Sequence, residues 1–330
     1  MGYNAEKAQQ KSFEIIKEPA MPALICGSLA YDTIMLFPER FRDHILPEQM
    51  HILNVSFLVP QLRREFGGVA GNISYNLKLL GGEPYPMGTV GDDFGPYQRH
   101  LDELGISTRY VRHMTGEFTP QAFITTDMED NQITAFHPGA MAHSHINRVA
   151  DAEGAKIGII APDGKQAMLQ HSQDFPKRGI PHVFDPGQAM TQFDGDELRE
   201  FIANANWIIA NDYEYQLLQE RTGMSGEQIA REVWALVVTK GGDGSVLYED
   251  GKVTEIHAAG VHEIKDPTGC GDAYRAGFIH GVLNDMDLET ACRIGSVMGA
   301  IKIEHLAPQH HRPEPQEIAD RFEAAYGYRF

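Results

Sequence analysis

Cysteine and positive charge are both scarce in this sequence. Its three cysteines, Cys26, Cys270 and Cys292, are scattered and odd in number, so they indicate neither a disulfide framework nor a zinc site. The 28 lysine and arginine residues stand against 46 aspartate and glutamate residues, and the net charge of −18 argues against a broad surface for nucleic acid or anionic membranes. An anionic small substrate would therefore need a local positive site.

Long hydrophobic segments are also missing. No apolar run is long enough to span a membrane, and the N-terminus lacks the apolar core of a signal peptide. We therefore expect a cytoplasmic protein that does not bind a membrane. Residues 1–20 are polar and precede the first apolar segment, and we interpret them as a tail.

Short apolar segments alternate with amphipathic ones along the rest of the chain. Near-continuous apolar character is typical of parallel strands covered on both faces, and the alternation predicts an α/β fold with a doubly wound, mostly parallel sheet flanked by helices. The strands are expected at 22–26, 156–161, 181–185, 206–210 and 235–239. The helices are expected at 70–80, 94–104, 163–177, 195–204, 226–233, 271–304 and 314–326.

Two regions interrupt this alternation. Residues 33–66 contain "IMLF" and "ILNVSFLV", and residues 117–137 contain "QAFITTD", a turn "MEDN" and "QITAF", which predict a hairpin. We expect these strands to form a small β-sheet lid on one α/β domain that covers residues 21–330. Periodicity alone also allows strands with no role in a site. An exposed lid edge could pair two subunits, which makes a homodimer an open alternative to a monomer.

The stretch "DPTGCGDAYRAGF" (266–278) combines a glycine turn, an aspartate and a helix start. The N–H groups around Gly269 and Gly271 would be free at the start of the helix, where the helix dipole attracts a phosphate group. Asp272 would then stand beside the phosphoryl group and accept a proton from an attacking hydroxyl. An N-cap role for Asp272 is the alternative that this stretch leaves open.

The stretch "FGGVAGNISYNLKLLG" (66–81) places paired glycines before another helix. Gly67 and Gly68 would let the backbone approach a ligand, and Asn72 offers a donor and an acceptor to a diol. Packing at a helix start is the alternative. The spacing is not G-x-G-x-x-G and the chain has no G-x-x-x-x-G-K-[ST], so neither a dinucleotide fingerprint nor a P-loop is indicated.

Taken with Gly81 and Gly91, "GGVAGNIS" resembles the first signature of the ribokinase-type (PfkB) kinase family, and several stretches look closest to bacterial adenosine and nucleoside kinases. "DPTGCGDAYRAGF" resembles the second signature, with Cys270 where alanine or glycine is usual. "NDYE" (211–214) and "TKGGDGS" (239–245) are similar to two further family elements. The four motifs occur in the order of the family.

The resemblance implies a ribokinase-like fold and an enzyme that transfers a phosphoryl group from ATP with Mg²⁺. Asp272 would be the catalytic base, and the backbone of Gly269, Cys270 and Gly271 would form the anion hole. Asp32 would hold vicinal hydroxyls, with Gly68 and Asn72 adding to the grip; otherwise Asp32 merely ends a turn.

The ATP side of the site is likewise implied by the resemblance. Glu214 would orient water around Mg²⁺, and Asn211 would help to place the phosphates, although this pair also has the spacing of a capping box. The residues that would line the ATP phosphates or ribose are Thr239, Gly241 and Gly244.

Some members of the family bind K⁺ beside the anion hole. Asp266, Thr268 and the carbonyl groups of 304–309 fall where such a site would lie, and the sequence leaves its occupancy open.

The substrate implied is a nucleoside, phosphorylated at its 5′-hydroxyl. A nucleobase needs flat apolar walls, which Phe123 and Phe136 of the lid could supply unless they are simply core residues. His137 could reach the base or the ribose, or be a lid residue with no role. A sugar kinase for ribose or fructose and a catalytically silent sensor are the alternatives.

Overall fold

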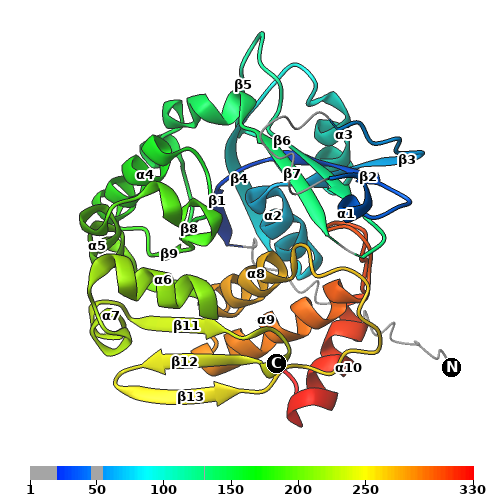
Figure 1. Cartoon of the computed structure of the whole chain (residues 1–330). Helices are drawn as coiled ribbons and strands as arrows, with labels where there is room; N and C mark the ends of the chain where they lie inside the picture. The colour runs from blue at the N-terminus through cyan, green and yellow to red at the C-terminus, as the bar shows by residue number, and fades with distance from the viewer. Residues whose placement is uncertain (1–20, 46–54, 130) are drawn as a thin grey trace, which may run out of the picture.

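The structure, a computed structural model, describes residues 21–45, 55–129 and 131–330. Within them, strands form a large sheet in the order β13-β12-β11-β10-β9-β8-β1-β4-β5 (Figure 1). From β11 across to β5 the neighbouring strands of this sheet are parallel, and β12 and β13 close the other edge in antiparallel fashion. Their bounds are β1 Pro22–Cys26, β4 Glu83–Val90, β5 Tyr110–His113, β8 Ile157–Ile160, β9 His182–Phe184, β10 Trp207–Asn211, β11 Ala235–Thr239, β12 Ser245–Glu249 and β13 Lys252–Ile256.

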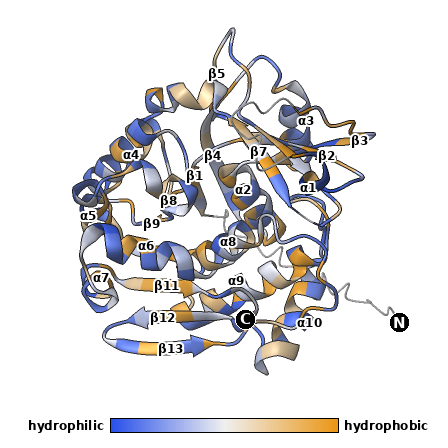
Figure 2. Ribbon diagram, viewed as in Figure 1, coloured by the Kyte–Doolittle hydropathy of each residue, from blue (hydrophilic) through white to orange (hydrophobic). Residues whose placement is uncertain are grey.

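Helices cover both faces of this sheet. On one face Ala23 and Ile25 pack with α2, α8 and α9, and on the other Leu24 and Cys26 pack in a cluster with α4, α5, α6 and α7. Because alternate side chains of a strand point to opposite faces, a strand buried on both faces must be apolar throughout. The bounds are α2 Val69–Leu79, α3 Gly95–Glu103, α4 Lys165–Arg178, α5 Gly195–Asn204, α6 Asp212–Thr222, α7 Gly226–Glu232, α8 Cys270–Leu283, α9 Leu288–Ile303 and α10 Pro315–Tyr326. Figure 2 shows that these outer helices carry hydrophilic as well as hydrophobic residues, as helices with one solvated face do.

A second, smaller sheet lies beside the first and forms the lid. Its order is β3-β2-β6-β7, and it packs through Tyr31 onto Tyr97 of α3, so an aromatic cluster joins the lid to the main domain. The bounds are β2 Ala30–Leu36, β3 Gln61–Gly67, β6 Gln121–Thr126 and β7 Gln132–His137, and the short helix α1 spans Phe41–His44.

The expected mostly parallel sheet with a β-sheet lid is confirmed, as are the expected main-sheet strands within a residue or two. The strand expected from "ILNVSFLV" (52–59) is wrong in its described part, because 55–59 belong to no strand and β3 begins at Gln61. The expected helix 271–304 is two helices, because Asp287 caps α9 after a break at 284–287. Residues 1–20, interpreted as a tail, lie outside the described residues.

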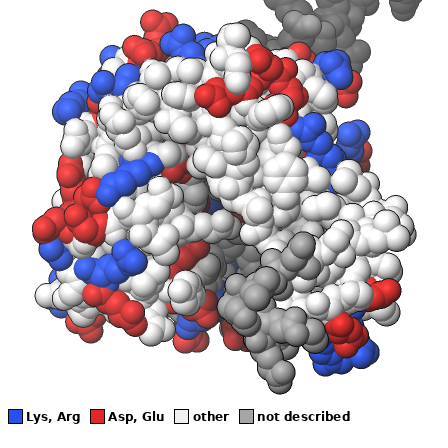
Figure 3. All heavy atoms as spheres, turned by 45° about the horizontal axis from the view of Figure 1, so that its top comes forward, with Lys and Arg blue, Asp and Glu red and all other residues white. Residues whose placement is uncertain are grey.

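The charge of the surface and the apolar character of the helices bear on which partners the protein could contact. On the face shown in Figure 3, acidic and basic side chains are interspersed and a broad uncharged area lies beside them. Among the described residues, no helix combines the length and the apolar character that crossing a membrane requires.

Candidate active site

Asp272 lies in the first turn of α8. The helix starts after Gly269, whose φ of +82° is a left-handed conformation that glycine adopts without strain. The amide Nδ2 of Asn72, on α2, donates to Asp272 Oδ2 at 2.8 Å. The two glycine-rich stretches, about two hundred residues apart, therefore meet at one carboxylate, and the N-cap role considered for Asp272 belongs to Gly269 instead.

Of the first N–H groups of α8, some donate hydrogen bonds within the protein and others do not. The N–H of Cys270 donates to Pro267 O at 3.2 Å, and that of Ala273 donates to Gly269 O at 3.0 Å. The N–H groups of Gly271 and Asp272 have no acceptor among the described residues. Since the start of a helix carries positive potential, these two amides are the best placed for an anion.

Asp32 of β2 is brought into the same site. An ideal Cβ added to Gly67 would lie 2.5 Å from Asp32 Oδ2, so a larger residue here would displace this carboxylate. Gly68, the N-cap of α2, has φ +80°. Burial, and then repulsion by Asp272, raises the pKa of Asp32 to about 6.

Burial also raises the pKa of Asp272 to about 6, although Arg275 and the hydrogen bond from Asn72 act against it. A carboxyl group with a pKa near 6 is ionised at neutral pH and is a stronger base than an ordinary aspartate. The two half-buried carboxylates thus influence each other electrostatically, and substrate hydroxyl groups could donate to either.

A buried chain of hydrogen bonds holds Asn72 in place. Gln309 Nε2 donates to Asn72 Oδ1 at 2.9 Å and to the hydroxyl of Tyr97 at 2.7 Å. That hydroxyl donates to Gly67 O at 2.8 Å. The chain fixes which way the Asn72 amide points, so that its NH₂ group faces Asp272.

Arg275 anchors the first turns of α8 to the main sheet. Its guanidinium donates to Asp185 Oδ1 at 2.6 Å and to Gly271 O at 3.0 Å, and lies 3.8 Å from Glu214 Oε2. Burial alone would lower the pKa of Arg275, but Asp185 and Glu214 outweigh it and the pKa is raised. The sequence analysis missed Asp185 and Arg275; their signals were a carboxylate directly after a buried strand, and a charge inside an apolar helix pattern.

The expected ATP residues lie together at the carboxyl ends of neighbouring strands. Asn211 ends β10, and its register partner Thr239 ends β11. Gly241 is exposed just beyond, whereas Gly244 is buried and its carbonyl accepts from the N–H of Lys240 at 2.8 Å. The exposed edge is therefore formed by Asn211, Thr239 and Gly241, and Gly244 closes the turn behind it.

The lid residues divide between the two faces of the small sheet. Asp32 pairs with Ala122, and Ala122 pairs with Phe136, so Phe136 projects from the face of Asp32. Phe123 and His137 occupy the alternate positions and project from the opposite face. The structure therefore brings Phe136 toward the site but not Phe123 or His137. By the same register Ile34 and Ile124 share the face of Asp32, and the sequence analysis missed both.

Two metal sites were expected from the sequence. Glu214 has its Oε2 accepting from Asn211 N at 2.9 Å while Asn211 Oδ1 accepts from Glu214 N at 2.7 Å. The capping box is therefore real. Glu214 Oε1 has no hydrogen-bond partner in the part of the chain that the structure describes, and it could hold water near the strand ends, which fits a Mg²⁺ ion that keeps its waters. Among the described residues no group of three or more His, Cys, Asp or Glu side chains could hold a metal alone.

The expected K⁺ residues are already engaged. Thr268 N donates to Asp266 Oδ1 at 2.9 Å and Ala307 N donates to Asp266 Oδ2 at 2.9 Å. The ammonium group of Lys302 donates to the carbonyl oxygen of Asp266 at 2.7 Å. This arrangement does not fit a bound cation, because a positive charge and two N–H donors already occupy the oxygens that would ligate it.

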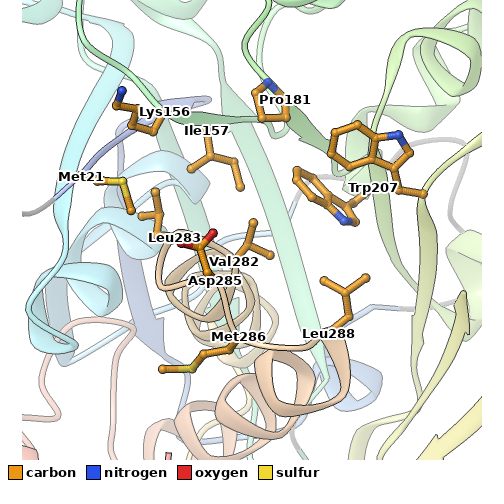
Figure 4. A pocket seen from close by; sticks show the side chains of 11 residues that line it. Met21, Lys156, Ile157, Pro181, Trp207, Val282, Leu283, Asp285, Met286 and Leu288 are labelled. Carbon is orange, nitrogen blue, oxygen red and sulfur yellow. The ribbon is translucent and has the colours of Figure 1, made fainter.

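A separate cavity of about 460 Å³ lies at the amino ends of the strands, at the opposite edge of the sheet (Figure 4). It is lined mainly by apolar side chains, among them Trp207, Val282 and Leu283. Ligands in open parallel sheets bind at the carboxyl ends of strands, where Asp272 lies, so this cavity is not the candidate active site.

The chain is similar to known proteins over most of its length. The profile described as "pfkB family carbohydrate kinase" matches residues 31–315. The nucleoside kinase of Burkholderia thailandensis, solved in complex with inosine, is 48% identical with a TM-score of 0.85, covering 93% of this chain and 99% of that one. The nucleoside kinase of Methanocaldococcus jannaschii is 30% identical with a TM-score of 0.85, covering 92% of this chain and 98% of that one. A nucleoside kinase of Methanothermobacter thermautotrophicus is 30% identical over 311 residues, which are 92% of this chain and 96% of the relative.

Proposed function

Because this chain belongs to the pfkB family of carbohydrate kinases, we propose that it transfers the γ-phosphoryl group of ATP to the 5′-hydroxyl of a nucleoside. Membership makes it a phosphotransferase with a hydroxyl acceptor. The observation that carries the proposal is Asp272, which is held by Asn72 at the start of α8 and whose charge acts on Asp32. The inosine complex of the Burkholderia thailandensis enzyme supports the choice of a nucleoside, and its complex with ADP-inosine supports ATP as the donor.

The residues divide the work between binding and chemistry. Asp32 accepts hydrogen bonds from the 2′- and 3′-hydroxyls, and Gly67 leaves room for the Asp32 carboxylate. Asp272 takes the proton of the 5′-hydroxyl as the oxygen attacks. The free amides of Gly271 and Asp272, with Gly269 and Cys270 shaping the turn, hold the negative charge of the transferring phosphoryl group.

The phosphoryl donor, ATP, binds at the carboxyl ends of the strands. Asn211, Thr239 and Gly241 contact the nucleotide, and Gly244 holds their loop. When bound, Mg²⁺ offsets the charge of the phosphates. Glu214 holds water next to it through its free oxygen, and the fixed capping box keeps this carboxylate in place.

Phe136 closes over the nucleobase from the lid, together with Ile34 and Ile124 on the same face. An apolar lid over a flat base excludes water from the reacting atoms. The alternative is that Phe136, which is 51% exposed, covers the lid sheet without contacting the nucleobase. The affinity for inosine of Phe136→Ala, compared with that of Phe123→Ala on the other face, distinguishes the two possibilities. Contact with the base predicts weaker binding for Phe136→Ala alone.

The decisive experiment is a panel of inosine, adenosine, cytidine, ribose and fructose, each with ATP and Mg²⁺, read out as ADP release. We expect turnover with nucleosides and little with free sugars. Preference for ribose or fructose would favour the sugar kinase, and binding without ADP release would favour a sensor.

A second copy of the chain is the partner that the lid suits best. β7 is an edge strand whose residues are all exposed, and on its outer side no strand of the described residues pairs with it, so its backbone groups could pair with another lid. Sedimentation of the protein at several concentrations tests for the dimer, and a monomer throughout would refute it.

A further inference from the structure

Lys302 is a buried charge close to the candidate anion site. Its side chain, in the last turn of α9, is 0% exposed. Nζ donates to the carbonyl oxygen of Asp266 at 2.7 Å and to that of His305 at 3.0 Å. The end of a helix favours a cation, but a buried ammonium still costs several kcal/mol unless partners of this kind surround it.

The two carbonyl groups belong to two loops that meet at the start of α8. Asp266 begins the turn that leads through Gly269 to Asp272. His305 begins the loop whose Pro308 lies against Gly269, where an added Cβ would come within 3.0 Å of Pro308 Cβ.

The second loop also reaches the catalytic carboxylate. Gln309 follows directly on Pro308 and holds Asn72, and Asn72 holds Asp272. One ammonium group thus joins the loop of the anion hole to the loop that orients the base.

K⁺ and a lysine ammonium carry the same charge and are both held by carbonyl oxygens. They cannot share one set of oxygens, because like charges repel strongly in a buried place. We propose that Lys302 is a positioning residue that supplies internally the charge for which some family members use K⁺, so that this chain works without an added monovalent cation. The kinetic part of this inference rests on the proposed phosphoryl transfer.

The first experiment uses the wild-type protein. Its ADP release is measured in KCl, NaCl and tetramethylammonium chloride at one ionic strength. We expect rates within about twofold of one another, whereas a coupled activator changes them roughly fivefold or more. Crystals soaked in a thallium salt should show no anomalous peak next to the Asp266 carbonyl. Activation by K⁺, or a thallium peak there, overturns the inference without any variant.

The second experiment removes the charge. Lys302→Ala should lose about 10- to 100-fold in kcat because the loops shift, and K⁺ or ethylammonium should restore part of the loss. The same variant should gain the thallium peak. Lys302→Met, whose side chain fills the space without charge, should not be restored. Lys265→Ala is the matched control, since Lys265 is exposed and paired with Glu263 at 3.2 Å.

The outcomes separate this inference from the proposed function. If no substrate yields ADP, the proposed function is wrong. The thallium measurement still tests whether Lys302 occupies the place of a monovalent cation. If the enzyme is active and Lys302→Ala shows neither cation rescue nor a thallium peak, Lys302 is structural only.

Discussion

Replacing Asp272 by asparagine should abolish most of the activity and at the same time stabilise the protein. The carboxylate is the proposed base, and loss of a positioned base lowers kcat by about 10²- to 10⁴-fold. The asparagine side chain keeps an oxygen that can accept from Asn72 Nδ2, so the local geometry should survive. Nucleoside binding at Asp32 should therefore change little.

The stability gain follows from the raised pKa of Asp272. A rise from 3.8 to about 6 means that the folded protein retains a proton which the unfolded chain has already released. The wild type consequently loses stability as pH rises from about 4 to about 6. At about 1.4 kcal/mol per pH unit the loss reaches an upper value of about 3 kcal/mol, all of it present at pH 8. The Asp272→Asn variant has no charge to bury at this position and avoids this loss.

The assay combines steady-state kinetics with urea unfolding at pH 5, 6.5 and 8. The stability difference between Asp272→Asn and wild type should grow with pH and level off above about 6. Asp151→Asn, which replaces an exposed aspartate in the 3-10 helix Val149–Asp151, is the control and should change neither quantity. Near-wild-type turnover of Asp272→Asn would refute the assignment of Asp272 as the catalytic base. An asparagine variant that is less stable than wild type at pH 8 would refute the electrostatic reasoning.

Three further predictions concern the residues around this carboxylate. Asn72→Ala removes a hydrogen bond that lowers the pKa of Asp272, so the acidic limb of the pH profile of kcat/KM should move to higher pH; an unmoved limb would contradict the contact. Gly68→Ala places a Cβ 2.5 Å from Ala30 N at φ +80° and should lower the free energy of unfolding by about 1–3 kcal/mol in urea titrations, more than the control Gly179→Ala, whose Cβ would meet nothing within 4 Å. Arg275→Met leaves Asp185 buried without its partner and should cost about 3–5 kcal/mol of stability, and Asp185→Asn in the same chain should recover part of it; equal stability of the single and double variants would show that the pair is not coupled.

Elements with a strong local signal could be predicted from the sequence. The strand "ALVVT" at 235–239 is apolar throughout because helices cover it on both sides, and β11 has these bounds. In contrast, β3, "QLRREFG", is polar and partly exposed, since one face of the lid is solvated and the other meets a site. Its strand character comes from pairing with β2, which local sequence does not encode. Hydrophobicity alone favours a strand in the neighbouring apolar stretch "ILNVSFLV", where residues 55–59 belong to no strand.

For the site, the sequence by itself determined which groups are available: the aspartates at 32 and 272, the glycine turns and the amides of a helix start. Their chemistry is local, because a turn that needs glycine and a carboxylate beside it are encoded within a few residues. Only the tertiary structure decided that Asn72 bonds Asp272, that Phe136 and not Phe123 shares the face of Asp32, and that Lys302 lies on the carbonyl of Asp266. These contacts join segments far apart in the chain, and strand register and helix packing, which depend on the whole fold, bring them together.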